Sequence, residues 1–319
     1  MFQVAEGADP QAHRRAARSS GTFEDVAKQY TAYAARKNKS WRQADALVNR
    51  QLLPRWGKLQ AAAIGRGDVK TMMRAIAAPV VANQTLASAS AIFSWAIKEE
   101  VGNIIVNSCT GIERNAAKPR ERVLSDSEIP QFWAAFDKVG LIEGAALKTI
   151  LLTGQRPGEV RHLRIEHIVD GWWTMPGDAV PELAWPGTKN GGSHRVWLTK
   201  VARQIIEEIG TTGTVFAGQR GGPINNLASA MQTICKDLGV ERATPHDLRR
   251  THGSTITALG FGRDAMNRVQ NHKEGGIASV YDRHQYADEN RHIMEMVAVR
   301  IMQLAEASAT SDVIASRFR

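Results

Sequence analysis

Two arginines in this sequence lie near the predicted starts of helices, where a cationic side chain can bind a phosphate group. In TGQRPGE, Pro157 suits the first position of a helix, so Arg156 stands at that helix's N-terminal end. Free N–H groups and partial positive charge gather at such an end, and a guanidinium there completes an anion site. Glu159 follows one turn later and is predicted to orient Arg156. Taken alone, the motif also fits an ordinary helix start with a surface arginine.

The second arginine belongs to the stretch ATPHDLRRT, which begins another predicted helix. Thr244 is its predicted N-cap, Pro245 takes the first helical position, and Gly260 ends the helix. His246 and Arg249 are three residues apart, so they share one face and can contact one phosphate group. Because surface His–Arg pairs are common, this pair gains meaning only in combination with the other motifs.

A lysine and a tyrosine complete the set of reactive groups. Lys189 begins a predicted KNGG turn, just before its flexible tip, between two predicted strands, WWTM and HRVWL. A lysine there can act as a proton donor if a second cation lowers its pKa, although it also fits a solvated turn. His272 precedes Tyr281 by nine residues, and Tyr281 lies in a polar stretch that does not suit a core aromatic. Tyr286 is the alternative nucleophile.

The order of these motifs resembles that of the tyrosine recombinase (phage integrase) family, and especially integrases of prophages and genomic islands. The resemblance covers residues 124–290 by motif and, more loosely, residues 22–107 as a core-binding helical domain. One departure is the third motif, NHKEGG, where many relatives have a glycine before the histidine. The resemblance implies a catalytic set made of Arg156, Lys189, His246, Arg249, His272 and Tyr281.

The resemblance also implies a mechanism. Tyr281 would attack a DNA phosphodiester to leave a 3′-phosphotyrosine and a free 5′ hydroxyl, and the two arginines would clamp the non-bridging oxygens. Lys189 would protonate the departing 5′ oxygen, while His246 and His272 would handle the tyrosine proton or bind the phosphate. No metal, ATP or other cofactor is expected. The expected partners are double-stranded DNA with core sites, three further copies in a homo-tetramer on paired sites, and DNA-bending accessory proteins.

Three other functions compete with a recombinase. A type IB topoisomerase shares the chemistry but acts as a monomer, without pairing two sites. A DNA-binding regulator with a decayed site would have lost some catalytic residues, whereas all six positions are filled here. A metal-dependent nuclease would need carboxylate clusters suited to Mg²⁺, and the sequence offers none.

Charge is distributed unevenly along the 319 residues, whose net charge is +9. Residues 1–123 carry 19 basic and 10 acidic side chains, whereas residues 124–319 carry 22 of each. Within residues 28–74 the count is 11 basic to 2 acidic, which favours a polyanionic partner such as nucleic acid. The densest cluster, predicted to contact DNA, consists of Arg36, Lys37, Lys39 and Arg42.

The elements that must position these residues are mainly helical. We expect a mainly α protein with a helical core-binding domain and a mixed, mostly helical catalytic domain containing a small antiparallel sheet. The predicted segments are an N-terminal linker at 1–21, the core-type DNA-binding domain at 22–107, an interdomain linker at 108–123 and the catalytic domain at 124–319. The first segment resembles the stretch that follows an arm-binding domain in relatives, so we expect a truncated chain or a member without that domain.

Three local expectations can be checked in the structure. Thr22 is a predicted N-cap, and a helix starting at Ser40 should stop before Pro54. Residues 287–307 should form a helix that docks either on a neighbouring protomer or on its own domain. Its predicted apolar stripe consists of Ile293, Met296–Val297, Val299–Arg300 and Leu304.

Composition also bears on location. The sequence is 43% hydrophobic and 23% charged, as in soluble globular proteins. Its two cysteines, Cys109 and Cys235, are too few for a disulfide framework or a four-ligand zinc site. We expect no signal peptide, no apolar run of the roughly 18 residues that span a bilayer, no membrane partner and a cytoplasmic location.

Overall fold

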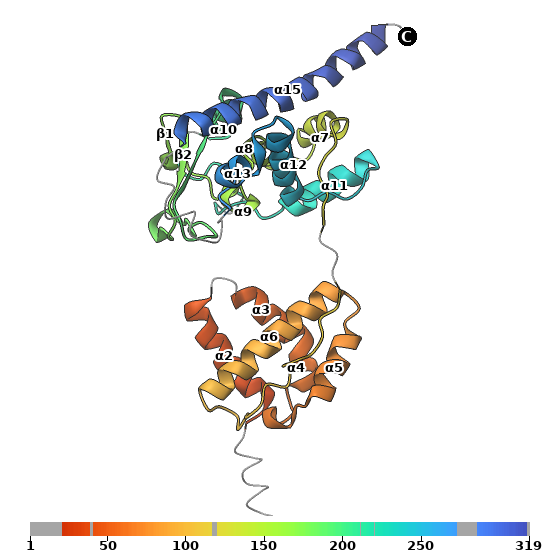
Figure 1. Cartoon of the computed structure of the whole chain (residues 1–319), viewed down its shortest axis with the longest axis vertical. Helices are drawn as coiled ribbons and strands as arrows, with labels where there is room; N and C mark the ends of the chain where they lie inside the picture. Colours follow the sequence, from red (N-terminus) through yellow and green to blue (C-terminus); the bar gives the residue numbers. More distant parts are fainter. Residues whose placement is uncertain are drawn as a thin grey trace, which may run out of the picture. The chain divides into compact units, whose positions relative to one another are not determined.

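The computed structural model divides the chain into two compact units, residues 1–120 and 121–319, here called the N-terminal and C-terminal units. Figure 1 shows both, and each is described by itself. The residues that the structure describes are 21–38, 41–116, 120–210, 212–219, 221–272 and 286–317, with side chains described as far as Glu306.

The N-terminal unit is built from helices packed around a long central one. These helices are α2 (Phe23–Lys37), α3 (Trp41–Leu47), the π-helical turn η2 (Val48–Leu52), α4 (Leu53–Trp56), the 3-10 turn η3 (Ala61–Ala63), α5 (Arg66–Ala75) and α6 (Pro79–Lys98). Helices α2, α3 and α5 all contact α6. Phe23 lies between Trp56 and Phe93 in the core, at ring-centroid distances of 5.4 and 5.9 Å.

Two local predictions concern Thr22 and Pro54, of which the first is confirmed and the second is wrong. Thr22 is the N-cap of α2, and its hydroxyl accepts a hydrogen bond from the Asp25 N–H. The expected stop before Pro54 is wrong, because the helical path continues through η2 and α4 to Trp56. In the π-helical turn the Leu53 N–H bonds the Val48 carbonyl, five residues back. This wider turn accommodates a proline ring that would clash with a regular helix.

Helix α6 corrects the expectation about apolar runs. It has 20 residues and a mean hydropathy of 1.2, so by length and composition it could cross a membrane. The same helix supplies much of the core of the N-terminal unit, including Ala82, Ala89, Ile92, Phe93 and Ala96, each at most 1% exposed. The central helix of a packed domain meets the same length and composition test, so this feature is explained by the fold.

The C-terminal unit is mostly helical, with one small sheet. Its helices are α7 (Glu128–Phe136), α8 (Leu141–Thr153), α9 (Pro157–Val160), α10 (Lys200–Ile209), α11 (Leu227–Leu238), α12 (Pro245–Ala258), α13 (Gly262–Val269) and α15 (Ala287–Arg317). Helix α8 runs through the centre, where it contacts α7, α10, α11, α12 and α15. The expected mainly α class is confirmed.

The sheet contains the two predicted strands and a third, short one. Strands β1 (Ile168–Val169), β2 (Trp172–Met175) and β3 (His194–Trp197) are antiparallel in that order. The KNGG segment is not a tight turn between β2 and β3. Residues 176–193 connect the strands and include the 3-10 turn η5 (Pro181–Leu183), so the lysine is carried on a long loop.

Both ends of the predicted interdomain linker are anchored. Cys109 is buried in the core of the N-terminal unit, and the Ser108 hydroxyl donates to the Ile64 carbonyl at 2.7 Å. At the other end, Arg122 forms a bidentate ion pair with Glu128 at the start of α7. The first residues of the stretch therefore belong to the N-terminal core.

Helix α15 packs on its own unit through its first half. Its buried residues are Ile293, Met294, Val297, Ala298 and Ile301. Met296 and Val299 of the predicted stripe are wrong, since their side chains are 38% and 48% exposed. Ile293, Val297 and Leu304 of the predicted stripe pack on the unit as expected. Contacts with α7, α8, α12 and β3 extend the buried face to Met294, Ala298 and Ile301.

Candidate active site

Arg156 stands where the sequence predicted, at the N-cap of α9 with Pro157 next to it. Its side chain donates to Glu159 at 2.9 Å, and its backbone N–H donates to the other oxygen of that carboxylate at 3.2 Å. Glu159 is only 5% exposed. The prediction that Glu159 orients Arg156 is confirmed, because a buried two-point contact fixes both the backbone and the guanidinium.

Helix α13 ends in a Schellman motif just before His272. The His272 N–H donates to the Asn267 carbonyl at 2.9 Å, and the Asn271 N–H donates to the Arg268 carbonyl at 3.2 Å. Asn271 has a φ of +51°, in the left-handed region that glycine and asparagine adopt most easily. The departure NHKEGG is therefore explained: Asn271 occupies a position that requires left-handed backbone, which a glycine would also supply.

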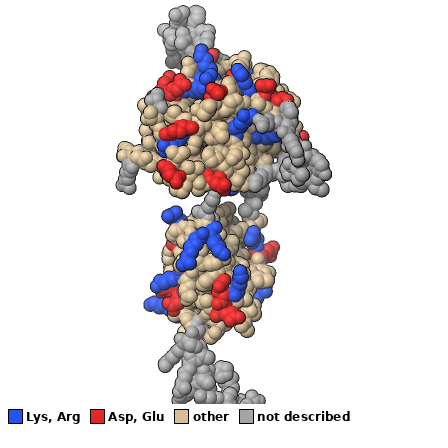
Figure 2. Space-filling model, turned by 90° about the vertical axis from the view of Figure 1, so that its left-hand side faces the viewer, with Lys and Arg blue, Asp and Glu red and all other residues tan. Residues whose placement is uncertain are grey.

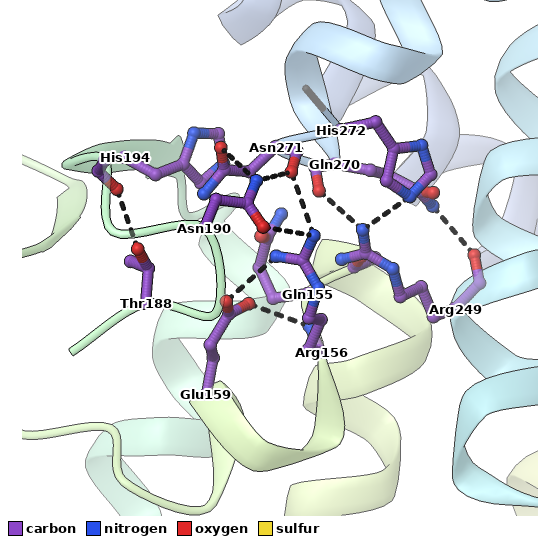
Figure 3. Close-up of polar contacts among 12 residues, drawn as sticks. Gln155, Arg156, Glu159, Thr188, Asn190, His194, Arg249, Gln270, Asn271 and His272 are labelled. Atoms are coloured by element: carbon purple, nitrogen blue, oxygen red, sulfur yellow. Dashed lines mark hydrogen bonds and ion pairs between the residues drawn. The ribbon is translucent and has the colours of Figure 1, made fainter. Parts of the chain in front are cut away.

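Three consecutive backbone carbonyls at this helix end accept hydrogen bonds from side chains of the motif stretches (Figure 3). We call the carbonyls of Val269, Gln270 and Asn271 the carbonyl cluster. Arg249 donates to Gln270, and Arg156 donates to Asn271 at 2.9 Å. Carbonyls at a helix C-terminus lack intrahelical partners and carry partial negative charge, so they suit guanidinium groups. Two arginines that are far apart in the sequence thus meet on neighbouring carbonyls.

Arg249 is held from both sides. Its second nitrogen donates to the Gly154 carbonyl at 2.7 Å, and only 6% of the residue is exposed. Burial, followed by the charge of Arg156, lowers the pKa of Arg249 to about 10. Gly154 has a φ of +64°, and a Cβ there would lie 2.3 Å from the His252 ring, so the approach of α12 requires glycine.

His272 completes the contacts of Arg249. Its Nε2 lies 2.9 Å from an Arg249 nitrogen and its Nδ1 lies 3.2 Å from the Asn267 side-chain oxygen. Because the guanidinium can only donate, these contacts require a neutral ring with its proton on Nδ1. Burial, followed by the charges of Arg249 and Arg156, lowers the pKa of His272. The neutral form is therefore favoured.

We call Arg156 and Arg249, with the carbonyls that they contact, the two-arginine centre. Two other predicted residues of this unit are Lys189 and His246. Both side chains are exposed. Desolvation lowers the pKa of His246 first, and the charges of Arg249 and Lys189 lower it further. Both are adjacent to residues of the centre, because Asn190, next to Lys189, contacts Arg156 and Asn271. His246 lies one turn before Arg249 in α12. The structure thus brings Arg156, Lys189, His246, Arg249 and His272 into one part of the C-terminal unit.

Sequence reasoning missed several side chains around the carbonyl cluster. Gln155 and His194 both donate to the Val269 carbonyl, at 2.9 and 3.1 Å, and Asn190 contacts Arg156 and Asn271. Burial lowers the pKa of His194 to about 4. These three residues lie in the quoted motif stretches, but they lack the cationic charge by which the other residues were recognised. The carbonyls that they contact cannot be recognised from a sequence, because every residue has one.

Two predicted residues lie outside the described residues: Tyr281, the predicted nucleophile, and Lys39 of the basic cluster. The alternative nucleophile, Tyr286, precedes α15, and the Arg268 guanidinium stacks 4.0 Å from its ring centroid. This stacking gives Tyr286 a packing role at the start of α15.

The remaining predicted DNA contacts are exposed on the N-terminal unit. Arg36 and Lys37 occupy the last turn of α2, where positive charge also complements the helix dipole. Arg42 stacks on Trp41 at 4.9 Å and Lys37 on Tyr33 at 5.0 Å. Figure 2 shows basic side chains on the visible face of this unit, with acidic ones among them, and both signs on the visible face of the C-terminal unit.

Comparison with known proteins identifies the family and the fold. A sequence profile described as the phage integrase family matches residues 122–288, which is just over half of the chain. Among curated proteins no match to the chain is found.

Solved structures of integrases share the fold. A lambda integrase dimer bound to a COC′ core site has a TM-score of 0.65 and 17% identity over 79% of this chain and 96% of that one. A lambda integrase tetramer on a Holliday junction has a TM-score of 0.66 and 17% identity over 85% and 80%. The Tn1549 transposon integrase, in complex with transposon right end DNA, has a TM-score of 0.61 and 16% identity over 87% and 99%.

Proposed function

The chain belongs to the phage integrase family, and from that premise we propose that it is a site-specific DNA recombinase that cleaves and rejoins strands through a 3′-phosphotyrosine. The observation that carries the proposal is the meeting of Arg156 and Arg249 on neighbouring carbonyls. Two guanidiniums and one carboxylate, Glu159, which pairs with Arg156, leave net positive charge in a partly buried site. Such a site favours an anion, and phosphate matches the planar donor geometry of arginine.

In the proposed first step, the phenolate oxygen of Tyr281 attacks the scissile phosphorus. The new P–O bond to tyrosine forms as the bond from phosphorus to the 5′ oxygen breaks, and Lys189 gives that oxygen a proton. Arg156 and Arg249 stabilise the negative charge that develops on the non-bridging oxygens. His246 and His272 bind the phosphate or accept the tyrosine proton. The reverse attack by a 5′ hydroxyl restores the DNA, so the step needs no external energy source.

The two units divide the work in this proposal. Residues 22–107 form the core-binding domain and residues 124–319 the catalytic domain. The exposed cations Arg36, Lys37 and Arg42, together with Lys39, supply sequence-tolerant phosphate contacts. Active assembly is a homo-tetramer on paired sites, helped by DNA-bending proteins, and we expect the protein in the cytoplasm.

The proposal can be tested even though the target sequence has not been identified. A library of duplexes with a random central sequence and a nick beside the cleavage position would trap covalent adducts, because the short released strand diffuses away. Sequencing the trapped DNA identifies a substrate, and peptide mapping identifies the attached residue. Tyr281→Phe should abolish the adduct and leave DNA affinity within a few-fold, since one hydroxyl contributes little to the whole phosphate interface.

Tyr286→Phe is the matched control, since it keeps the ring that stacks under Arg268 and removes only a hydroxyl. It should form adducts at the normal rate. Adducts that persist in the Tyr281 variant and vanish in the Tyr286 variant would identify Tyr286 as the nucleophile.

A second assay distinguishes a recombinase from a topoisomerase. Strand exchange between two recovered duplexes indicates a recombinase, whereas relaxation of supercoils by a monomer without exchange would indicate a topoisomerase.

A further inference from the structure

We infer that Asn190 is a positioning residue that fixes the Lys189 loop to the two-arginine centre, so that the lysine is placed for proton transfer. The inference rests on the proposed function and adds a residue that the family motifs do not include. Asn190 follows Lys189 directly, so any contact that holds its side chain also limits where the lysine backbone can go.

The side chain of Asn190 joins three motif stretches at one point (Figure 3). Its amide nitrogen donates to the Asn271 carbonyl at 2.6 Å and lies 3.2 Å from the Asn271 side-chain oxygen. Its oxygen accepts from Arg156 at 3.3 Å. One amide therefore bridges the lysine loop, the first arginine and the residue before His272. Asparagine can do this because it carries a donor and an acceptor on the same short side chain.

The other contacts of the loop tip lie within the connection between β2 and β3 itself. The Thr188 N–H donates to the Gly177 carbonyl at 3.0 Å, and a Cβ on Gly177 would lie 2.5 Å from the Gly191 carbonyl oxygen. A Cβ placed on Gly191 or Gly192 would meet no atom within 4 Å, so both glycines border open space. The Thr188 hydroxyl bonds the Gly192 carbonyl at 2.8 Å, which closes the tip on itself without tying it to another element. Glycines add backbone freedom, so a tip of this kind depends on an outside anchor.

A second contact shows where the loop is held farther along. His194, at the start of β3, donates to the Val269 carbonyl at 3.1 Å. Asn190 and His194 thus tie both sides of the glycine pair to the carbonyl cluster that binds the two arginines. Of these two anchors, Asn190 is the one adjacent to Lys189. Its loss should therefore impair the step that needs the lysine and leave the arginine contacts to Glu159, Gly154 and Gln270 in place.

The test compares four proteins on one recovered duplex in two chemical forms. The proteins are wild type, Lys189→Ala, Asn190→Ala and Ser193→Ala. Ser193 is the matched control, because its hydroxyl also makes a loop hydrogen bond, to the Gly177 N–H at 3.2 Å, without touching the centre. The second duplex carries sulfur in place of the 5′ bridging oxygen, a leaving group that departs without protonation.

On the oxygen duplex we expect Lys189→Ala to cleave about 100- to 1,000-fold more slowly, within the range of general-acid catalysis. Asn190→Ala should cleave about 10- to 100-fold more slowly, because a mobile lysine spends less time at the leaving oxygen. Ser193→Ala should stay within a few-fold of wild type. On the sulfur duplex all four proteins should cleave at similar rates, which a general loss of folding would not produce.

Two results would overturn the inference while leaving the proposed function intact. One is an Asn190→Ala protein that matches wild type on the oxygen duplex. The other is an Asn190→Ala protein that stays slow on the sulfur duplex while Lys189→Ala recovers, which would mean that Asn190 serves the arginines and not the lysine. Failure of the proposed function itself would look different, since wild type would then form no adduct with either duplex.

Discussion

Arginines do two different jobs in the two units of this protein. Arg249 in the C-terminal unit is 6% exposed, and its guanidinium is bound by the Gly154 and Gln270 carbonyls. Arg36 and Arg42 in the N-terminal unit are exposed, and Arg42 lies over the Trp41 ring. In the first case the guanidinium is fixed by backbone acceptors, and in the second the guanidiniums lie at the surface.

The net charge of a unit and the placement of its charges affect different properties, namely affinity and reaction rate. The unit with excess positive charge has its cations at the surface, where in the proposed function they would raise affinity for any nucleic acid. The C-terminal unit is neutral by count yet brings two guanidiniums onto two neighbouring carbonyls. Preorganised donors of this kind act on the reaction rate, because they do not have to rearrange when charge develops.

The largest effect should come from breaking the buried arrangement. Arg249→Lys keeps a positive charge but loses the fork that reaches Gly154 and Gln270 at once. Cleavage of the trapped duplex should fall about 100- to 1,000-fold, with DNA affinity within a few-fold of wild type. Single-turnover rates and binding curves on the same duplex measure the two quantities. Near-normal cleavage would show that charge alone suffices.

Acid should weaken the C-terminal unit more than the N-terminal unit. Burial lowers the pKa values of His194 and His252 from 6.5 to about 4, and residues 21–116 contain no histidine. Between pH 6.5 and 4 the unfolded chain binds protons that the folded chain excludes, so stability falls as pH falls through this window. The loss approaches about 3 kcal/mol per histidine.

Chemical denaturation at pH 7.5, 6 and 5 checks this sign. The His252→Gln variant should lose stability less steeply than wild type as the pH is lowered. His252 is the better target because it is fully buried, with its Nδ1 on the Leu151 carbonyl at 3.0 Å. If the variant showed the same pH dependence as wild type, the acid sensitivity would come from groups other than His252.

Charge reversal in the N-terminal unit should change affinity and spare chemistry. The double variant Arg36→Glu, Arg42→Glu should bind about 10- to 100-fold more weakly near 0.1 M salt and lower the salt slope by about two units. Its cleavage rate at saturating DNA should match wild type. The double lysine variant at these positions is the control and should keep the slope. A changed rate constant at saturation would contradict the division of labour.

The smallest effect concerns the backbone under the carbonyl cluster. Asn271→Ala should cost about 1 kcal/mol of unfolding free energy, because alanine tolerates a left-handed backbone poorly. Asn271→Gly should come within about 0.5 kcal/mol of wild type. Urea denaturation at neutral pH compares them. Equal losses in the two variants would place the effect in the contact with Asn190 and not in the φ angle.

Local signals in the sequence determined the residues that start helices and the chemistry they bring. Pro157 and Thr244 begin their helices as predicted, and Glu159 orients Arg156. Prediction failed where packing chose between possible local structures. A π-helical turn accommodated Pro54, and neighbouring elements left Met296 and Val299 outside the buried face of α15.

The tertiary structure alone decided how the motifs meet. Arg156, Asn190 and Arg249 are brought together by the carbonyls of Gln270 and Asn271 at the end of α13. Every residue type carries the same backbone carbonyl, so no letter in the sequence marks these two as the acceptors. They are acceptors because α13 ends there, so its last carbonyls have no partner within the helix. They accept instead from side chains at the start of α9, in α12 and in the lysine loop. The sequence by itself determined which side chains could do such chemistry, and the packing of α13 determined where they meet.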